Sequence, residues 1–117
     1  MKTLLWLDDC RDPMKNDWMT FSCIGNNCEV VWVKTYRGFV EYIEQNGMPD
    51  GINFDHDIEN FHITKSTYVE KTGMTCALWL VDYCMDNNVE LPKWYTHSAN
   101  PVGKKNIDRL LTNFMKR

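Results

Sequence analysis

Hydrophobic residues in this chain gather in four short runs, separated by segments with a different pattern. A compact run rich in Val, Leu, Ile or aromatic residues is typical of a strand that is buried on both faces, as in a parallel sheet. The pattern therefore predicts strands at residues 3–7, 29–33, 52–54 and 94–96.

Three other segments place apolar residues at i, i+3, i+4 and i+7, the spacing of one helix face. Polar caps, a proline at a first helical position and a terminal glycine mark where these helices begin and end. The predicted helices run from Thr35 to Gly47, from Met74 to about Asn87, and onward from Asn100 and Pro101.

Two connections lack either pattern. The residues between Asp9 and Glu29 include Pro13 and Gly25 and show no sustained helical period, which indicates an irregular connection. The polar stretch from residue 59 to 71 could form a lid. Strands that alternate with helices then favour an α/β fold with a mostly parallel sheet and right-handed crossovers.

Composition fits one domain spanning residues 1–117, because 44% hydrophobic residues can fill one core. Thirteen Lys and Arg against sixteen Asp and Glu give a net charge of -3, which excludes a long nucleic acid as partner. The apolar start is interrupted by Asp8 and Asp9, too early for a signal peptide or a membrane span, so we expect a cytoplasmic protein. The five cysteines should be reduced and mostly buried, and the spacing of Cys23 and Cys28 makes structural zinc a poor interpretation.

Polar residues with useful chemistry follow three of the four predicted strands: Asp8-Asp9, Asp55-His56-Asp57, and His97-Ser98 with Asn100. In open α/β sheets the ligand site lies outside the carboxyl ends of the strands, where these groups would meet. Clustered carboxylates repel one another unless a cation lies between them.

Mg²⁺, or Mn²⁺, suits such oxygen ligands, and we predict that Asp8, Asp9 and either Asp55 or Asp57 hold it. The alternative is that some of these aspartates cap turns, which is the better interpretation for Asp12 beside Pro13.

Two histidines stand at neighbouring strand ends, where they could transfer protons at a phosphorus atom. His56 or His97 would activate water or a ribose hydroxyl while the other protonates the leaving oxygen. Either could instead be a structural histidine. His62, within the polar stretch, has no comparable support.

Ser98, Asn100 and the N-terminus of the last helix, with Lys104 in its first turns, could hold a phosphate. An ordinary Asn-Pro cap with solvated lysines explains the same residues. Arg11 could bind phosphate through two parallel hydrogen bonds, or could simply pair with Asp12. Three of the tryptophans, Trp18, Trp32 and Trp94, are expected in the core.

Four motifs together resemble one family: Leu7-Asp8-Asp9-x-Arg11-x-Pro13, Phe54-Asp55-His56-Asp57, Thr72-Gly73, and His97-Ser98-Ala99-Asn100-Pro101-Val102-Gly103. The chain resembles the cyclic-phosphate-processing receiver domains of bacteria and phages over nearly its full length. The last motif is the most specific of the four.

This resemblance implies a flavodoxin- or receiver-like three-layer sandwich with sheet order 2-1-3-4. It also implies a metal position at Asp8 and Asp9, and a phosphoacceptor position at Asp55. No fifth strand with a phosphate-contacting lysine follows the last helix, and signalling receivers do not normally carry histidines at positions 56 and 97. These departures favour hydrolysis over phosphorelay.

The leading hypothesis is therefore a metal-dependent phosphodiesterase or phosphohydrolase, acting on a 2′,3′-cyclic RNA end or a small cyclic nucleotide. A phage source would suggest interference with a nucleotide-based defence in the host cytoplasm. One alternative is a non-catalytic module that binds a cyclic nucleotide or is phosphorylated on Asp55. A second is an interaction protein whose chemistry has decayed, which would neither bind metal nor turn over substrate.

Overall fold

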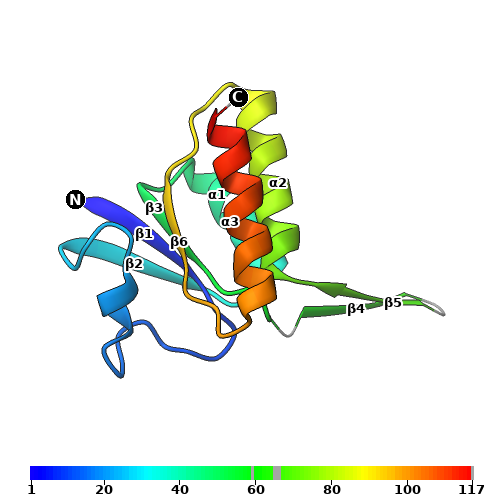
Figure 1. The fold of residues 1–117 in the computed structure, drawn as a ribbon, viewed down its shortest axis with the longest axis horizontal. Helices are drawn as coiled ribbons and strands as arrows, with labels where there is room; N and C mark the ends of the chain where they lie inside the picture. Colours follow the sequence, from blue (N-terminus) through cyan, green and yellow to red (C-terminus); the bar gives the residue numbers. More distant parts are fainter. Residues whose placement is uncertain (59, 65–66, 117) are drawn as a thin grey trace.

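Four parallel strands form the central sheet, in the order β2-β1-β3-β6 (Figure 1). They are β1 (Lys2–Leu7), β2 (Cys28–Val33), β3 (Gly51–Phe54) and β6 (Lys93–Thr96). The computed structural model describes residues 1–58, 60–64 and 67–116, and residues 60–64 and 67–70 by their backbone alone. The parallel sheet expected from the sequence is confirmed, and so is the order 2-1-3-4 that the family resemblance implies, with β6 as the fourth strand.

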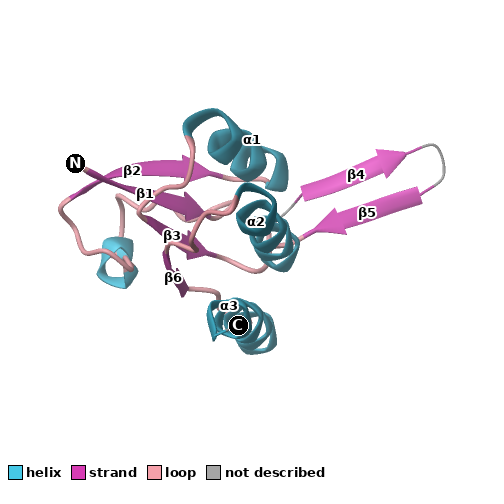
Figure 2. Cartoon of the chain, turned by 90° about the horizontal axis from the view of Figure 1, so that it is seen from above, coloured by secondary structure: helices cyan, strands magenta, loops and turns pink. Residues whose placement is uncertain are grey.

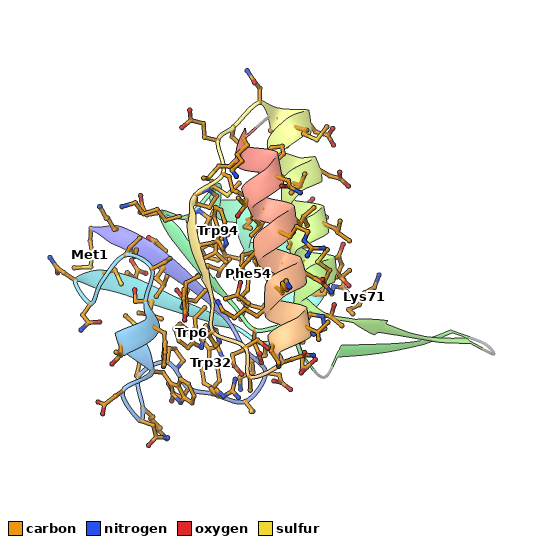
Figure 3. All side chains as sticks on the ribbon, viewed as in Figure 1. Met1, Trp6, Trp32, Phe54, Lys71 and Trp94 are labelled. Carbon is orange, nitrogen blue, oxygen red and sulfur yellow. The ribbon has the colours of Figure 1, made fainter. Side chains whose placement is uncertain are left out.

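Three helices cover one face of this sheet: α1 (Tyr36–Asn46), α2 (Gly73–Asn87) and α3 (Pro101–Lys116) (Figure 2). Thr35 and Asn100 accept the first backbone N–H groups of α1 and α3, as the sequence predicts for N-caps. The core between sheet and helices is apolar, and Phe54 lies in it (Figure 3). Within the described residues, no helix combines the length and the apolar character that crossing a bilayer requires.

The opposite face of the sheet is covered by the connection between β1 and β2, which holds only a short 3₁₀ helix, η1 (Trp18–Phe21). Asn53 of β3 is fully buried on this face and anchors the connection, because its amide bonds the backbone of both Phe21 and Cys23. A side chain at Gly51 would collide with Cys23, so the connection packs closely against β3. The irregular connection expected from the sequence is therefore an ordered third layer.

The predicted polar stretch contains an antiparallel hairpin, β4 (Asn60–Thr64) and β5 (Thr67–Lys71), which projects away from the sheet (Figure 2). These strands were not expected, because the segment has no continuous apolar run. Residues 59, 65 and 66 of the expected lid lie outside the described residues, so its role as a lid stays a prediction.

The five cysteines form no disulfide. Cys76 and Cys84 are buried, as their helical pattern predicted. Cys23 and Cys28 are only partly buried, and Cys10 is exposed beside Asp9, so fewer of the thiols are buried than the sequence suggested.

Candidate functional site

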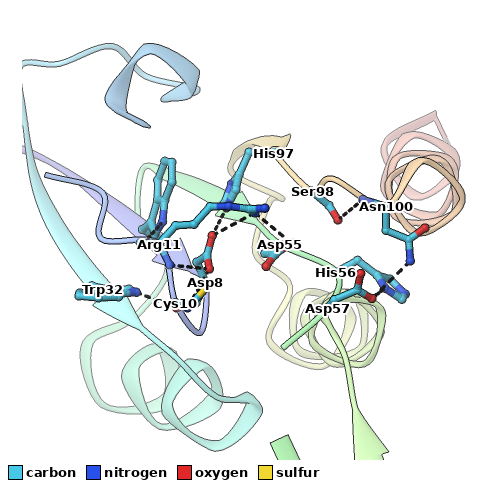
Figure 4. Close-up of polar contacts among 11 residues, drawn as sticks. Asp8, Cys10, Arg11, Trp32, Asp55, His56, Asp57, His97, Ser98 and Asn100 are labelled. Carbon is cyan, nitrogen blue, oxygen red and sulfur yellow. Dashed lines mark hydrogen bonds and ion pairs between the residues drawn. The ribbon is translucent and has the colours of Figure 1, made fainter. Parts of the chain in front are cut away.

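The polar residues at the ends of β1, β3 and β6 meet at one edge of the sheet (Figure 4). The backbone N–H of Asp8, Asp55 and His97 each donates to the last residue of a neighbouring strand, at 3.1, 2.9 and 2.9 Å. The sheet ladder therefore extends one residue beyond the strands. This extension fixes where all three side chains begin, as the sequence predicted from parallel pairing.

Asp8 is the most enclosed carboxylate of the site, with a fully buried side chain. Its Oδ1 accepts the backbone N–H groups of Cys10 and Arg11, both at 3.0 Å, and its Oδ2 lies 3.0 Å from His97 Nε2. Burial opposes ionisation, but the hydrogen bonds from His97, Arg11 and Cys10 outweigh it and hold the pKa of Asp8 below its ordinary value. Asp8 is thus a carboxylate whose lone pairs are mostly engaged.

His97 lies beneath this site rather than at its surface, because its side chain has no exposed area. Its ring stacks on Trp6, with centroids 4.2 Å apart and planes at 14°. Nδ1 is buried without a hydrogen-bond partner in the described part of the chain, so a proton on Nε2, donated to Asp8, best satisfies the ring. In this conformation His97 positions Asp8 and cannot touch a ligand.

Arg11 joins the ends of β1 and β3. Its Nη1 lies 3.6 Å from Asp8 Oδ2 and 3.8 Å from Asp55 Oδ1. The guanidinium also lies 5.0 Å from the ring centroid of Trp18 in η1, a cation–π arrangement. The ion pairs of Arg11 among the described residues are therefore with Asp8 and Asp55 and not with Asp12. The Asp12 carboxylate accepts the N–H of Met14 in a local turn.

Asp55 differs electrostatically from Asp8 although both are buried. Burial and then the nearby Asp8 carboxylate raise the pKa of Asp55, against the opposing effects of His97, Arg11 and a hydrogen bond from Ser98. The pKa values of these two neighbouring carboxyl groups are therefore shifted in opposite directions. Such a separation is typical of sites that need one carboxylate and one carboxylic acid.

His56 has the features of a proton-transfer residue. Its Nδ1 lies 2.8 Å from Asp57 Oδ1, and the hydrogen bond from His56 lowers the pKa of Asp57. Asn100 Nδ2 donates to the same carboxylate oxygen at 3.3 Å. Asp57 thus orients the ring of His56, whose side chain keeps 19% of its area exposed.

Two glycines allow this arrangement. A Cβ at Gly103 in the first turn of α3 would lie 2.6 Å from Cδ2 of the His56 ring, so the ring rests directly on the helix backbone. A Cβ at Gly73, at the start of α2, would overlap the backbone of Asp55, and the Gly73 N–H donates to the His56 carbonyl at 2.7 Å. The N-termini of α2 and α3 therefore both pack closely against the segment that carries Asp55 and His56.

The residues predicted to hold phosphate divide into two groups. Ser98 accepts the Asn100 N–H at 3.0 Å and also forms a hydrogen bond with Asp55. Ser98 and Asn100 therefore lie with the polar residues at the strand ends. Lys104 does not join them: its Nζ donates to the Thr96 carbonyl at 2.9 Å and to Asp108 at 3.3 Å, above the Tyr95 ring. The phosphate-binding roles of all these residues stay predictions.

The predicted metal ligands are also divided. Asp8, Asp9 and Cys10 bring donor atoms within 4.8 Å of one another. However, Cys10 offers a soft thiol, whereas Mg²⁺ and Mn²⁺ prefer oxygen ligands. Asp57 is engaged with His56, and the Arg11 guanidinium lies between Asp8 and Asp55. The residues as they stand do not fit a divalent ion shared by Asp8 and Asp55.

Sequence reasoning missed the aromatic residues around the site. Trp6 supports His97 and donates to the Arg11 carbonyl at 3.3 Å, and Trp32 donates to the Asp8 carbonyl at 2.7 Å. Trp32 and Trp18 are only partly buried and border the site, whereas Trp94 does pack against the core. The one available signal was position, since Trp6 and Trp32 each lie one residue before the end of their strand.

Comparison with known proteins supports the same fold and family. The profile of the cyclic-phosphate processing receiver domain matches residues 3–113. The signal receiver domain of a protein named as a Luxo repressor, from Vibrio parahaemolyticus, superimposes with a TM-score of 0.57 at 13% identity, over 93% of this chain and 72% of that one.

A fusion carrying the trimeric coiled coil of yeast Spc42 (amino acids 181–211) gives a TM-score of 0.58 at 19% identity. The alignment covers 93% of this chain and 60% of the fusion's length. At these identities both likenesses show the fold alone. No curated protein matches the sequence.

Proposed function

This chain belongs to the family of cyclic-phosphate processing receiver domains, and we propose that it opens a small cyclic phosphate by hydrolysis, with His56 as the general base. The His56–Asp57 pair carries the proposal, because its 2.8 Å contact fixes the ring nitrogen that faces Asp57 and leaves the other for proton transfer. The substrate class is a nucleoside cyclic phosphate or a 2′,3′-cyclic RNA end.

The proposed reaction is attack of water on phosphorus. His56 takes a proton from the water as the new P–O bond forms, and one ring P–O bond breaks to give a phosphomonoester. The leaving oxygen needs a proton, and Asp55 is the candidate acid because burial and Asp8 raise its pKa toward the protonated form. Asp55 then regains a proton from solvent, and His56 releases one.

Arg11 and the start of α3 supply the phosphate-holding groups in this proposal. Arg11 keeps 27% of its side chain exposed, so it can face a phosphate while remaining near Asp8 and Asp55. Ser98 and Asn100 shape the opposite side of the site through the α3 cap. His97 is retained as a positioning residue that holds Asp8. The predicted Mg²⁺ or Mn²⁺ takes no step in this proposal, because the guanidinium of Arg11 lies between Asp8 and Asp55.

The test is a panel of 2′,3′-cyclic nucleotides, 3′,5′-cyclic nucleotides and cyclic oligonucleotides, each with chelator, Mg²⁺ or Mn²⁺, with ring opening followed by ³¹P NMR. We expect His56→Gln to lower the rate by about 10²–10⁴-fold. Asp57→Asn should give a smaller loss, because it misorients the base without removing it.

Arg109→Gln is the matched control, since Arg109 is an exposed residue further along α3. His56→Gln with an unchanged rate would remove His56 from the proposal. If no cyclic phosphate turns over while a small phosphodonor labels Asp55, the phosphorylated-module alternative is the better one.

A further inference from the structure

Arg11 occupies the space between the two buried carboxylates of the site. Its Nη1 lies within 3.8 Å of both Asp8 and Asp55, whose side chains are 0% and 6% exposed. Water therefore screens this pair of carboxyl groups poorly. When Asp55 is ionised, a cation close to both groups limits their repulsion. Arg11 is that cation in the structure.

Arg11 is held in this place by more than charge. Its backbone N–H donates to Asp8 Oδ1 at 3.0 Å, its carbonyl accepts from Trp6, and its guanidinium lies against Trp18. Lysine would keep the charge but not the planar group that stacks on the indole. The segment around Arg11 is thus built to bring a guanidinium to this position.

A divalent ion bridging Asp8 and Asp55 would need the same space. The guanidinium and such an ion exclude each other, because their charges repel and both would use the Asp8 and Asp55 oxygens that face Arg11. Asp8 has little further capacity, since two backbone N–H groups and His97 already occupy its oxygens.

We propose that Arg11 is the resident counter-ion of the Asp8–Asp55 pair, and that it keeps a divalent ion out of the space between them. Arg11 takes the place that the predicted metal would have held, and the site presents a guanidinium, in place of a metal ion, to its phosphate ligand. The phosphate part of this statement rests on the proposed hydrolysis; the exclusion of metal does not.

Mn²⁺ binding to the full-length protein tests the exclusion without any substrate. Titration followed by electron paramagnetic resonance should show weak binding for the wild type and binding at least about tenfold tighter for Arg11→Gln. Arg11→Lys keeps the positive charge and should stay close to the wild type. Lys104→Gln removes a positive charge that contacts Thr96 and Asp108 instead, so it should leave Mn²⁺ affinity unchanged.

The location of the new ion is tested by a second substitution. Asp55→Asn added to Arg11→Gln should abolish the gain, because the bridging oxygens of Asp55 are lost. Circular dichroism and thermal melts establish that each variant is folded, and Arg11→Ala provides a second neutral replacement.

Tight Mn²⁺ binding by the wild type, or no gain in either neutral Arg11 variant, would overturn the proposal. A gain that persists without Asp55 would also overturn it, since the ion would then bind elsewhere, for example at Asp9 and Cys10. These results are independent of turnover. A protein that opens no cyclic phosphate can still gain Mn²⁺ affinity when Arg11 is replaced, and a protein that does open one can show no such gain.

Discussion

Gly103→Ala should disturb the site by one methyl group. The added Cβ would lie 2.6 Å from Cδ2 and 2.8 Å from Cβ of His56, whereas ordinary contacts begin near 3.4 Å. The ring must therefore move by several tenths of an ångström or more. It cannot move freely, because Asp57 holds Nδ1 at 2.8 Å and the Gly73 N–H holds the His56 carbonyl.

Overpacking of this kind costs about 1–3 kcal/mol, and the gain in helix propensity from Gly to Ala returns at most about 1 kcal/mol. We expect a net loss of about 1–2 kcal/mol in the free energy of unfolding, which for a domain of this size lowers Tm by about 4–8 °C. Thermal denaturation by circular dichroism measures it.

Gly38→Ala is the matched control, because it also lies in the first turns of a helix but its Cβ would meet only Thr35 Oγ1 at 3.2 Å and Val33 at 3.7 Å. Its Tm should stay within about 2 °C of the wild type. If Gly103→Ala has the same Tm as Gly38→Ala, or if His56 keeps its NMR chemical shifts in Gly103→Ala, the methyl group does not displace the His56 ring.

Three further changes probe the energetics. Asp8 has a lowered pKa in the folded protein, so its ionised form contributes stability that is lost as pH falls through that pKa. Asp8→Asn should lower Tm at pH 7, with a smaller difference in acid. Asp55 has a raised pKa, so its contribution is present at low pH and is lost as pH rises through that pKa. Asp55→Asn should therefore raise Tm at pH 7, and the opposite order of the two variants would contradict the electrostatic account. Asn53→Ala leaves the Cys23 N–H and the Phe21 carbonyl without their partner and should cost about 2–4 kcal/mol in urea denaturation; a loss below about 1 kcal/mol would mean that water replaces the amide.

The four strands of the central sheet and the three α-helices were predictable because each depends on a local pattern, which the hairpin β4–β5 lacks. The apolar runs had no competing helical period, and Thr35 and Asn100 lie where cap chemistry requires them. The convergence of Asp8, Asp55 and His97 was predictable for a different reason, since parallel strands bring their carboxyl ends to one edge.

The contacts across the site were not predictable from the sequence. Arg11 and Asp55 are far apart along the chain, and nothing local distinguishes Asp8 from Asp12 as the partner of Arg11. The two histidines looked equivalent, because both follow a strand. Their difference comes from two contacts. Trp6 stacks on His97 beneath the surface, and the absence of a side chain at Gly103 lets the His56 ring pack directly against the backbone of α3.

The connection between β1 and β2 both covers one face of the sheet and carries Arg11. In most α/β domains the cover is a helix and the ligand-contacting loop is a separate segment, so either can loosen alone. Here, local opening of the β1–β2 connection would expose Trp6 to water and would at the same time remove the Arg11 guanidinium from Asp8 and Asp55. Amide hydrogen exchange of residues 9–27 should consequently slow when an anion binds, making local opening of this layer a direct readout of ligand occupancy.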